Sequence, residues 1–589
     1  MKSHLSLSRL LGSKDIYPNE ALSTKRHYAE RIGSKRLRQF AALYLSPVKQ
    51  KEDIALEELI AQWFTFNGNH TYQQSPSFTY IYDHLRRIRN FHAGEHLHLI
   101  NSEALLNLLV WLENNPDLPE EVAEDAGVTI HLFHLNLLFN DDVLAFYQQG
   151  AEITRLVQDD NYLQRVTLSL SFSQADLFNI DYSQLFYTQF YKAIRLLDFL
   201  EATPKYQPLF QAFLAEFGVS KKDYFKLLGL AIVAGSKGQD GWNVIQVPKD
   251  DLYAENCAFL DKVAITPDYD VLDEQNDYLS LRSRPIKRID DGEYISLFPL
   301  FLIKKLFNGT IFLLSDLQQR RPELLSGSFL GHIRADFSEE VLLYDVLDQL
   351  YPKTATVRLT GKVLKAAGMI REPDYYLRVG NTVVLHESKD FFIPGETKLS
   401  YNIDEIEKLL KTDGRGSVPP KPDRLGKAVV QVAANIERVL KMQIAGDTDY
   451  DPAVVEIFPV IVVYDSLYSA AGLNFRVHYW MEDEINKLKA KPEFEGVDFS
   501  RVHPVTLVEI DTLINYESYF ANGTLDYIGL LRAYQQTMNY QKVNITDIVQ
   551  FAEQSCMSFS KFIGDVCMER NLPLDLSRLN ALLISYGIV

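Results

Sequence analysis

Cysteine is nearly absent from this chain, and its scarcity excludes two structural classes. Only three cysteines occur among 589 residues: Cys257, Cys556 and Cys567. They lie far apart and lack the close spacing of zinc-binding cysteines, so neither a disulfide framework nor a structural zinc site is predicted. We therefore expect the protein to work in a reducing compartment, the cytoplasm.

Long apolar runs are also missing. The best candidate, from Ile295 to Phe307, is interrupted by Lys304 and Lys305 and is shorter than the ~20 residues that a membrane-spanning helix needs. The N-terminus lacks the continuous apolar core of a signal peptide, because serine, arginine and lysine interrupt it throughout. The sequence therefore predicts no membrane partner.

Positive charge is in deficit, with 60 Lys and Arg against 78 Asp and Glu, a net charge of −18. This balance argues against a protein that coats nucleic acid by bulk electrostatics. It leaves room for a local basic groove, because salt confines the influence of a charge to about 8–10 Å. The chain also contains no GxxxxGK[ST], GxGxxG or GxSxG motif, so ATP-driven and acyl-transfer chemistry are not expected.

The chain is too long for one hydrophobic core, so two to four domains are expected. Changes in periodicity and composition suggest four consecutive regions. They are a helical sensor or assembly domain (1–240), a mixed α/β connecting region (241–330), an α/β core (331–480) and a mostly helical C-terminal region (481–589). Within 331–480 the patterns predict the order α-β-β-β-α-β.

The stretch EPDYYLRVGNTVVLHESKD (372–390) carries the strongest chemical signal. Apolar and polar residues alternate on both sides of Gly380-Asn381, which predicts a tight β-hairpin. Side chains alternate between the faces of a strand, so Glu387 and Lys389 share one face, and the turn brings Asp374 toward them. Charged groups gathered at a buried sheet end are costly unless something pairs them.

A divalent cation would pair these groups. Mg²⁺ typically takes one or two carboxylates and completes its shell with water and substrate phosphate. Asp374 and Glu387 are thus candidate ligands, and Lys389 could orient an attacking water and stabilise developing negative charge. The residues predict a metal site that acts on a phosphodiester.

Pro373-Asp374 followed by Glu387-Ser388-Lys389 resembles the motif of the PD-(D/E)xK nucleases, the restriction-endonuclease-like superfamily. The predicted order of elements over residues 331–480 is similar to that family's core. The resemblance implies an α/β nuclease core between a large, mostly helical N-terminal region and a helical C-terminal tail. It also implies a DNA substrate, Mg²⁺ (with Mn²⁺ as the alternative) at Asp374 and Glu387, and a catalytic role for Lys389.

The resemblance further implies two accessory residues. In many members a glutamate from the preceding helix joins the site, and Glu339 and Glu340 both qualify. Glu340 is preferred, because a buried stripe then lies beside it, formed by Leu342, Leu343, Val346 and Leu347. In some members a glutamine follows from the next helix. Gln431 is placed for this role, on a polar line with Lys427 and Asn435.

A basic, Gly- and Pro-rich segment, KTDGRGSVPPKPDR (411–424), precedes the Gln431 helix. It is either a phosphate clamp at the rim of the active site or a solvated loop. The predicted nucleic-acid-binding residues are Lys411, Arg415, Lys421, Arg424 and Lys427. A second basic stretch, residues 23–40, is predicted as an assembly surface or a phosphate contact.

Three functions therefore compete. The preferred one is a gated DNA endonuclease, such as a prokaryotic antiviral defence effector with partner subunits or a homo-oligomeric state. The second is a catalytically idle scaffold subunit with a nuclease fold. The third is an RNA-cutting toxin, because Arg87 and His92 have the R-x₄-H spacing of HEPN ribonucleases. His131 and His134 lie on an apolar segment and are predicted to be core or interface residues.

Overall fold

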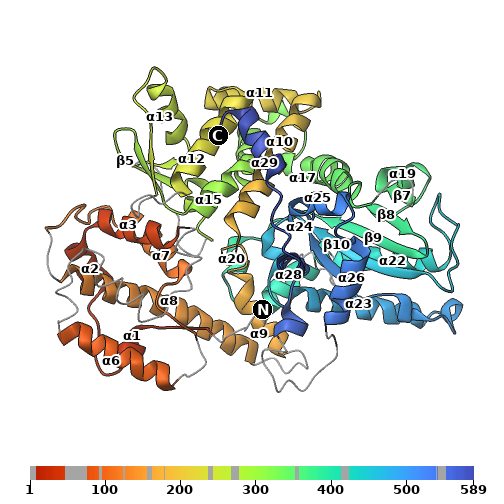
Figure 1. The fold of residues 1–589 in the computed structure, drawn as a ribbon, viewed down its shortest axis with the longest axis horizontal. Helices are drawn as coiled ribbons and strands as arrows, with labels where there is room; N and C mark the ends of the chain where they lie inside the picture. The colour runs from red at the N-terminus through yellow and green to blue at the C-terminus, as the bar shows by residue number, and fades with distance from the viewer. Residues whose placement is uncertain are drawn as a thin grey trace. The chain divides into compact units, whose positions relative to one another are not determined.

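The structure is a computed structural model in which the chain forms two compact units, each assembled from separate segments (Figure 1). It describes residues 8–46, 76–91, 96–123, 127–155, 162–177, 180–236, 243–266, 277–351, 357–412, 423–538, 540 and 552–588. The first unit comprises Met1–Gln149, Leu214–Thr310 and Leu583–Val589, and the second comprises Gly150–Phe213 and Ile311–Leu582.

The first unit is mostly helical in its described residues. Asn101 caps one helix by accepting a hydrogen bond from the Ala104 amide at 3.1 Å, and the apolar sequence that follows is buried almost all round. The main helices are α1 (Ser13–Ile16), α2 (Lys25–Ile32), α3 (Ser34–Tyr44), α6 (Pro76–Phe91), α7 (Ser102–Glu113), α8 (Val128–Arg155), α12 (Lys221–Ser236), α13 (Tyr253–Asp261), α14 (Leu279–Ser283) and α15 (Pro299–Lys304).

Two small sheets accompany these helices. Strands β1 (Ser8–Leu10) and β2 (His96–His98) pair in parallel. A four-stranded sheet has the order β3-β6-β5-β4. Its strands are β3 (Val244–Gln246), β4 (Ala264–Ile265), β5 (Ile286–Asp290) and β6 (Glu293–Ser296). The β5–β6 pair is antiparallel, and Gly292 in its turn has the positive φ of +71° that glycine adopts readily.

The second unit is built on a five-stranded sheet in the order β11-β10-β9-β8-β7. Its strands are β7 (Val357–Thr360), β8 (Tyr375–Val379), β9 (Thr382–Lys389), β10 (Glu456–Val463) and β11 (Thr506–Glu509). The β7–β8 and β8–β9 pairs are antiparallel, whereas β9, β10 and β11 run parallel. The carboxyl ends of these three strands therefore meet at one edge, where open α/β sheets commonly bind ligands.

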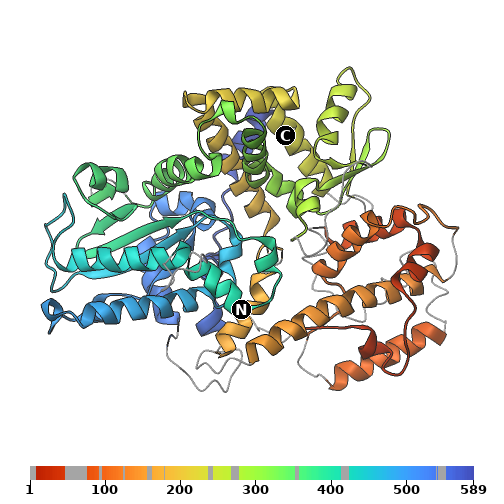
Figure 2. The same cartoon turned by 180° about the vertical axis from the view of Figure 1, so that it is seen from behind.

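Helices cover both faces of this sheet (Figures 1 and 2). On one face α22 (Arg424–Leu440) and α23 (Leu473–Lys489) pack beside each other, and the apolar stripe of α22 shares a core with Leu385 and other strand residues. On the other face lie α24 (Ile510–Asn515), α26 (Tyr527–Thr537) and α28 (Phe559–Glu569). There Tyr527 stacks against His386, so Leu385 and His386 point to opposite faces, as strand alternation requires.

The remaining helices of the second unit connect and flank the sheet. They are α9 (Tyr162–Phe172), α10 (Tyr182–Ala202), α16 (Thr310–Arg320), α17 (Phe329–Ile333), the π-helix η6 (Arg334–Leu343), α18 (Tyr344–Leu347), α19 (Gly361–Ala366), α20 (Gly395–Lys398), α21 (Ile403–Lys411) and α25 (Glu517–Ala521). Helices α11 (Gln207–Phe217) and α29 (Ser577–Tyr586) each have residues in both units. The predicted helix-strand-strand-strand-helix-strand order is present here, with α19, α20 and α21 inserted. Its relation to a nuclease fold stays a prediction.

The four consecutive regions differ from the two observed units. Helix α10, predicted within residues 1–240, belongs to the second unit, where buried Lys192 pairs with Asp511 Oδ1 at 2.7 Å. The C-terminal region supplies β11 to the sheet. Contacts between distant segments, which composition does not report, decide these boundaries. Within the described ranges, no helix has both the length and the apolarity needed to cross a membrane.

Candidate active site

The hairpin of residues 375–389 forms as predicted. Val379 pairs with Thr382 and Tyr375 with His386, so Gly380 and Asn381 make a two-residue turn. Gly380 adopts a φ of +57°. The register places Asp374 opposite Glu387, and Asp374 Oδ2 accepts a hydrogen bond from the Ser388 amide at 2.6 Å.

Glu387 and Lys389 lie side by side at the end of β9. The Lys389 ammonium donates hydrogen bonds to Glu387 Oε1 at 2.5 Å and to the Ser388 carbonyl oxygen at 3.0 Å. Glu387 is 1% exposed, and its other carboxylate oxygen, Oε2, is buried and has no hydrogen-bond partner among the described residues. Buried carboxylate oxygens are normally paired, so this oxygen is available to a ligand.

Glu339, not Glu340, joins this pair of carboxylates. Glu339 is half-buried and shares a hydrogen bond with Asp374, whereas Glu340 is exposed and pairs with Lys362 at 3.3 Å. The sequence-based choice of Glu340 is therefore wrong as to geometry. The physical reason is that both residues lie in a π-helix, whose hydrogen bonds span five residues rather than the four of an α-helix. The different number of residues per turn rotates Glu339, instead of Glu340, toward the site.

The electrostatics show that the four groups act on one another. Burial, followed by the charge of Asp374, raises the pKa of Glu387 to about 8. Burial and Asp374 likewise raise the pKa of Glu339 to about 8, and burial raises that of Asp374. Burial lowers the pKa of Lys389, but Glu387, Asp374 and Glu339 outweigh it and raise that pKa. Lys389 is therefore held as an ammonium ion.

Gln431 lies on α22, which covers the same sheet face as Leu385 and hence as Glu387. Its side-chain oxygen is buried, and no hydrogen-bond partner for it exists among the described residues. On the same polar line, Asn435 accepts a hydrogen bond from Arg438 at 2.6 Å, and Lys427 is exposed. The accessory role of Gln431 stays a prediction.

The predicted nucleic-acid contacts are only partly described. Arg415 and Lys421 lie outside the described residues. Lys411 lies over the Trp480 ring, 5.7 Å from its centroid. Arg424 donates to the Leu409 carbonyl oxygen at 2.7 Å. These two side chains thus already have partners in the protein, and among the described members of the set both Lys411 and Lys427 are exposed.

Sequence reasoning missed Tyr464, which ties the site together. Its hydroxyl donates to the Ser338 carbonyl oxygen at 2.8 Å and contacts Ser388 Oγ at 3.0 Å. Ser338 precedes Glu339, so one buried tyrosine from the end of β10 joins the π-helix to the end of β9. Ser338 Oγ in turn donates to Asp390 Oδ2 at 2.7 Å. The position of Tyr464 directly after an apolar strand was the available signal.

Outside this site, the other residues that the sequence singled out either have structural roles or lie outside the described residues. His134 is half-buried and contacts the Tyr17 hydroxyl at 3.0 Å, and burial lowers its pKa to about 4. Arg87 is exposed on α6, whereas His92 lies outside the described residues, so the R-x₄-H pair is untested. All three cysteines are free and buried.

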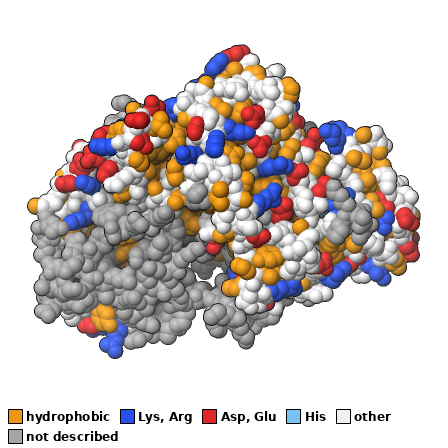
Figure 3. Space-filling view, turned by 45° about the horizontal axis from the view of Figure 1, so that its top comes forward, with side chains coloured by type: hydrophobic (Ala, Val, Ile, Leu, Met, Phe, Trp, Pro, Cys, Tyr) orange, Lys and Arg blue, Asp and Glu red, His pale blue; other side chains and the backbone are white. Residues whose placement is uncertain are grey.

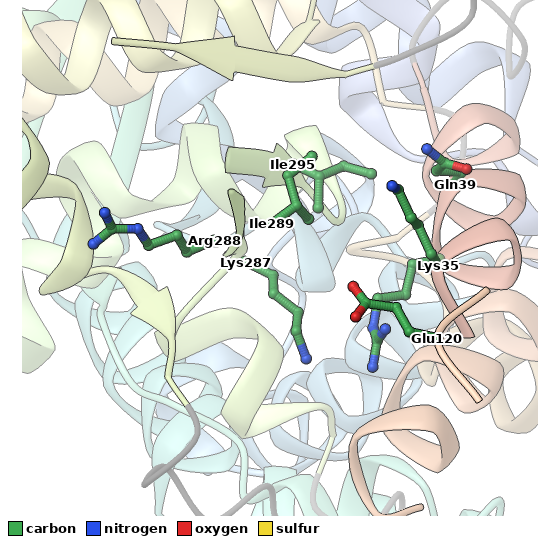
Figure 4. Close-up of a pocket in the computed structure, with 8 residues that line it drawn as sticks. Lys35, Gln39, Glu120, Lys287, Arg288, Ile289 and Ile295 are labelled. Carbon is green, nitrogen blue, oxygen red and sulfur yellow. The ribbon is translucent and has the colours of Figure 1, made fainter. Parts of the chain in front are cut away.

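The basic stretch of residues 23–40 contributes to a small cavity of the first unit (Figure 4). The cavity is lined by Lys35, Arg38, Gln39, Glu120, Lys287, Arg288, Ile289 and Ile295. Glu113 pairs with both Arg38 and Lys287, and Glu121 pairs with Lys35 at 2.6 Å. These cations are therefore used within the unit, and the cavity contains none of the predicted catalytic residues.

The coloured surface carries basic and acidic side chains interspersed, rather than one basic patch, on the face in Figure 3. On this face, any contact with nucleic acid would therefore be local.

The donor set fits a Mg²⁺ ion held by two carboxylates. No described residue bonds the buried Glu387 Oε2, and the Tyr375–His386 register, extended by one pair, places Asp374 opposite Glu387. No group of three or more His, Cys, Asp and Glu side chains in the described part of the chain is arranged to hold a metal. Mg²⁺ bound by one or two carboxylates, water and substrate phosphate does not require such a group.

Comparisons with known proteins add no relative: no family model matches the chain, no curated protein matches it, and no solved structure matches it. Function is therefore inferred from the geometry of the site.

Proposed function

We propose that this chain is a metal-dependent nuclease of the PD-(D/E)xK kind that hydrolyses phosphodiester bonds in DNA. One observation carries the proposal: Glu339, Asp374, Glu387 and Lys389 come together at the end of β9, and a buried oxygen of Glu387 finds no hydrogen-bond partner in the described part of the chain. The raised pKa values show that ionising these three carboxyls together is unfavourable in the metal-free protein, and a divalent cation would offset that cost by stabilising their ionised forms.

Each residue has a distinct role in this proposal. Asp374 and Glu387 would hold Mg²⁺, or Mn²⁺ in its place, and the bound ion would neutralise charge on the phosphoryl group. Glu339 hydrogen-bonds Asp374 and so positions its carboxylate. Lys389 keeps its proton, so it acts as a hydrogen-bond donor that orients water and stabilises negative charge, and not as a general base.

DNA is proposed as the substrate by analogy with the family that the motif resembles. The negative net charge supports an enzyme whose access to DNA is local and restrained. A gated antiviral effector that works with partner subunits or as a homo-oligomer would need such restraint.

Plasmid DNA and a structured RNA, each incubated with the full chain in Mg²⁺, in Mn²⁺ and in EDTA, test the proposal. We expect DNA cleavage with either metal, none in EDTA, and none from Lys389→Ala. Lys362→Ala is the matched control, because Lys362 is an exposed lysine that pairs with Glu340. Cleavage of RNA alone in EDTA would contradict the proposal and favour metal-independent HEPN chemistry.

A second candidate, an idle scaffold subunit, is favoured by the Lys389–Glu387 ion pair. The 2.5 Å contact between them already compensates one buried carboxylate without a metal. In that case Lys389→Ala would destabilise the fold, and the wild-type protein would cut neither substrate in any metal. An inactive wild-type protein that also fails to gain stability from Mg²⁺ would establish this alternative over the nuclease.

A further inference from the structure

Two phenylalanines from distant parts of the chain meet beside the candidate active site. Phe312 of α16 and Phe392, three residues after Lys389, contact each other with ring centroids 4.8 Å apart and planes tilted by 43°. Phe312 remains 49% exposed. An extended backbone advances about 3.3 Å per residue, so Phe392 lies within roughly 10 Å of Lys389. Phe392 is half-buried. An aromatic pair with one exposed ring at such a position suggests a ligand.

In the segment after β9, the Phe391 ring is buried in the core and the Phe392 ring is half-buried. Phe391 is buried, packs on Tyr468 with centroids 4.9 Å apart, and its carbonyl oxygen accepts the Tyr468 hydroxyl at 2.6 Å. These contacts fix the backbone, so Phe392 is presented by an anchored segment. Packing in the hydrophobic core therefore explains Phe391, whereas Phe392 is not part of that core cluster.

An arginine completes the arrangement. The Arg334 guanidinium carbon lies 5.7 Å from the Phe392 ring centroid, within the range of a cation–π contact. Among the described residues, its buried Nε has no hydrogen-bond partner and the side chain forms no ion pair, but its charge partly offsets the rise that burial causes in the pKa of the Asp390 carboxyl. Arg334 lies five residues before Glu339 in the π-helix, which is one hydrogen-bonded turn. The cation thus lies on the helix that supplies an acid to the site.

We infer that Phe312, Phe392 and Arg334 form a platform for one unpaired nucleotide of the DNA strand at the cut, with the base on the rings and a phosphate at the guanidinium. Aromatic stacking with basic side chains is how single strands are bound without sequence preference. A paired base is already stacked in its duplex. The inference rests on the proposed function and narrows its substrate to DNA that is single-stranded at the cleavage point, such as a free strand or a frayed end.

Binding in EDTA tests the platform apart from cleavage. A fluorescent oligothymidine, the same strand with one abasic position, and a duplex of equal length are titrated with full-length Lys389→Ala protein. We expect the strand to bind more tightly than the duplex. Phe312→Leu and Phe392→Leu, which keep an apolar cover, should each weaken strand binding by about 5- to 50-fold, the effect of losing one stacked base, and leave duplex binding unchanged.

Two controls sharpen the result. Phe146→Leu replaces a phenylalanine that is 39% exposed on α8, in the first unit, and should have no effect. The abasic strand should lose affinity for the parent protein but not for Phe392→Leu. Arg334→Gln should lower the slope of log affinity against log salt by about 0.7, the value for one phosphate contact to a single strand.

The two hypotheses fail differently. Leucine variants that bind the strand as tightly as the parent, or that lose strand and duplex affinity equally, would overturn the platform, whether or not the protein cuts DNA. A wild-type protein that cuts nothing, but whose strand affinity depends on both rings, would overturn the nuclease and keep the platform as a binding site.

Discussion

Replacing Glu387 by glutamine should stabilise the metal-free protein at high pH and abolish its response to Mg²⁺. Glutamine keeps the shape of the side chain and an oxygen that can accept from Lys389, but it carries no charge. In the wild-type protein, burial and Asp374 raise the pKa of Glu387 to about 8 from 4.5. A carboxyl with a raised folded-state pKa favours folding below its unfolded pKa, and this contribution is lost as the pH rises through 8.

The size of the effect follows from these two pKa values. Each pH unit between them corresponds to about 1.4 kcal/mol, so ionising Glu387 costs the folded state at most roughly 5 kcal/mol. The protonation of Glu387 is coupled to that of Asp374 and Glu339, so the free-energy cost of ionisation is distributed over three carboxyls. Above pH 8, we expect the unfolding free energy of Glu387→Gln to exceed that of the wild type by roughly 1–3 kcal/mol. Near pH 4.5, the two unfolding free energies should be nearly equal.

Urea unfolding measures this difference near pH 5 and near pH 9, with EDTA and with Mg²⁺. Mg²⁺ should raise the unfolding free energy of the wild type at high pH, because a ligand of the folded state stabilises it, and leave Glu387→Gln unchanged. Glu340→Gln is the matched control, since Glu340 is exposed and pairs with Lys362. A stability difference that is the same at both pH values, or an equal Mg²⁺ response in both proteins, would refute the reasoning.

Three further outcomes are expected from the same contacts. Glu339→Gln should lower DNA cleavage by about 10- to 100-fold in a plasmid assay, and Glu340→Gln should not; the reverse result would restore the helix phase expected from sequence. Lys192→Met should lower the unfolding free energy measured with urea by roughly 3 kcal/mol, because it leaves Asp511 without its buried partner. The double variant with Asp511→Leu should recover much of this loss. A double variant that recovers none of it would show that the ion pair is unimportant. Tyr464→Phe should cost roughly 1–2 kcal/mol and reduce cleavage with little change in substrate affinity, whereas unchanged turnover would remove its positioning role.

The sequence by itself determined the local part of the candidate site. Alternation along residues 382–389 and the Gly380-Asn381 turn predicted the hairpin, and strand periodicity alone placed Glu387 and Lys389 on one face with Asp374 nearby. These contacts depend on neighbours in the chain, so short-range geometry suffices to predict them. The nuclease activity stays a prediction.

The tertiary structure decided everything that depends on distant partners or on the hydrogen-bond pattern of a helix. Glu339 replaced Glu340 because the helix is a π-helix, which residue periodicity at 3.6 per turn does not anticipate. Tyr464 contacts the π-helix and β9 because β10 pairs with β9 in the folded sheet. Phe312 and Phe392, 80 residues apart in the numbering of the chain, met only through packing. Such contacts are set by the free energy of burying whole elements against one another, which no local pattern encodes.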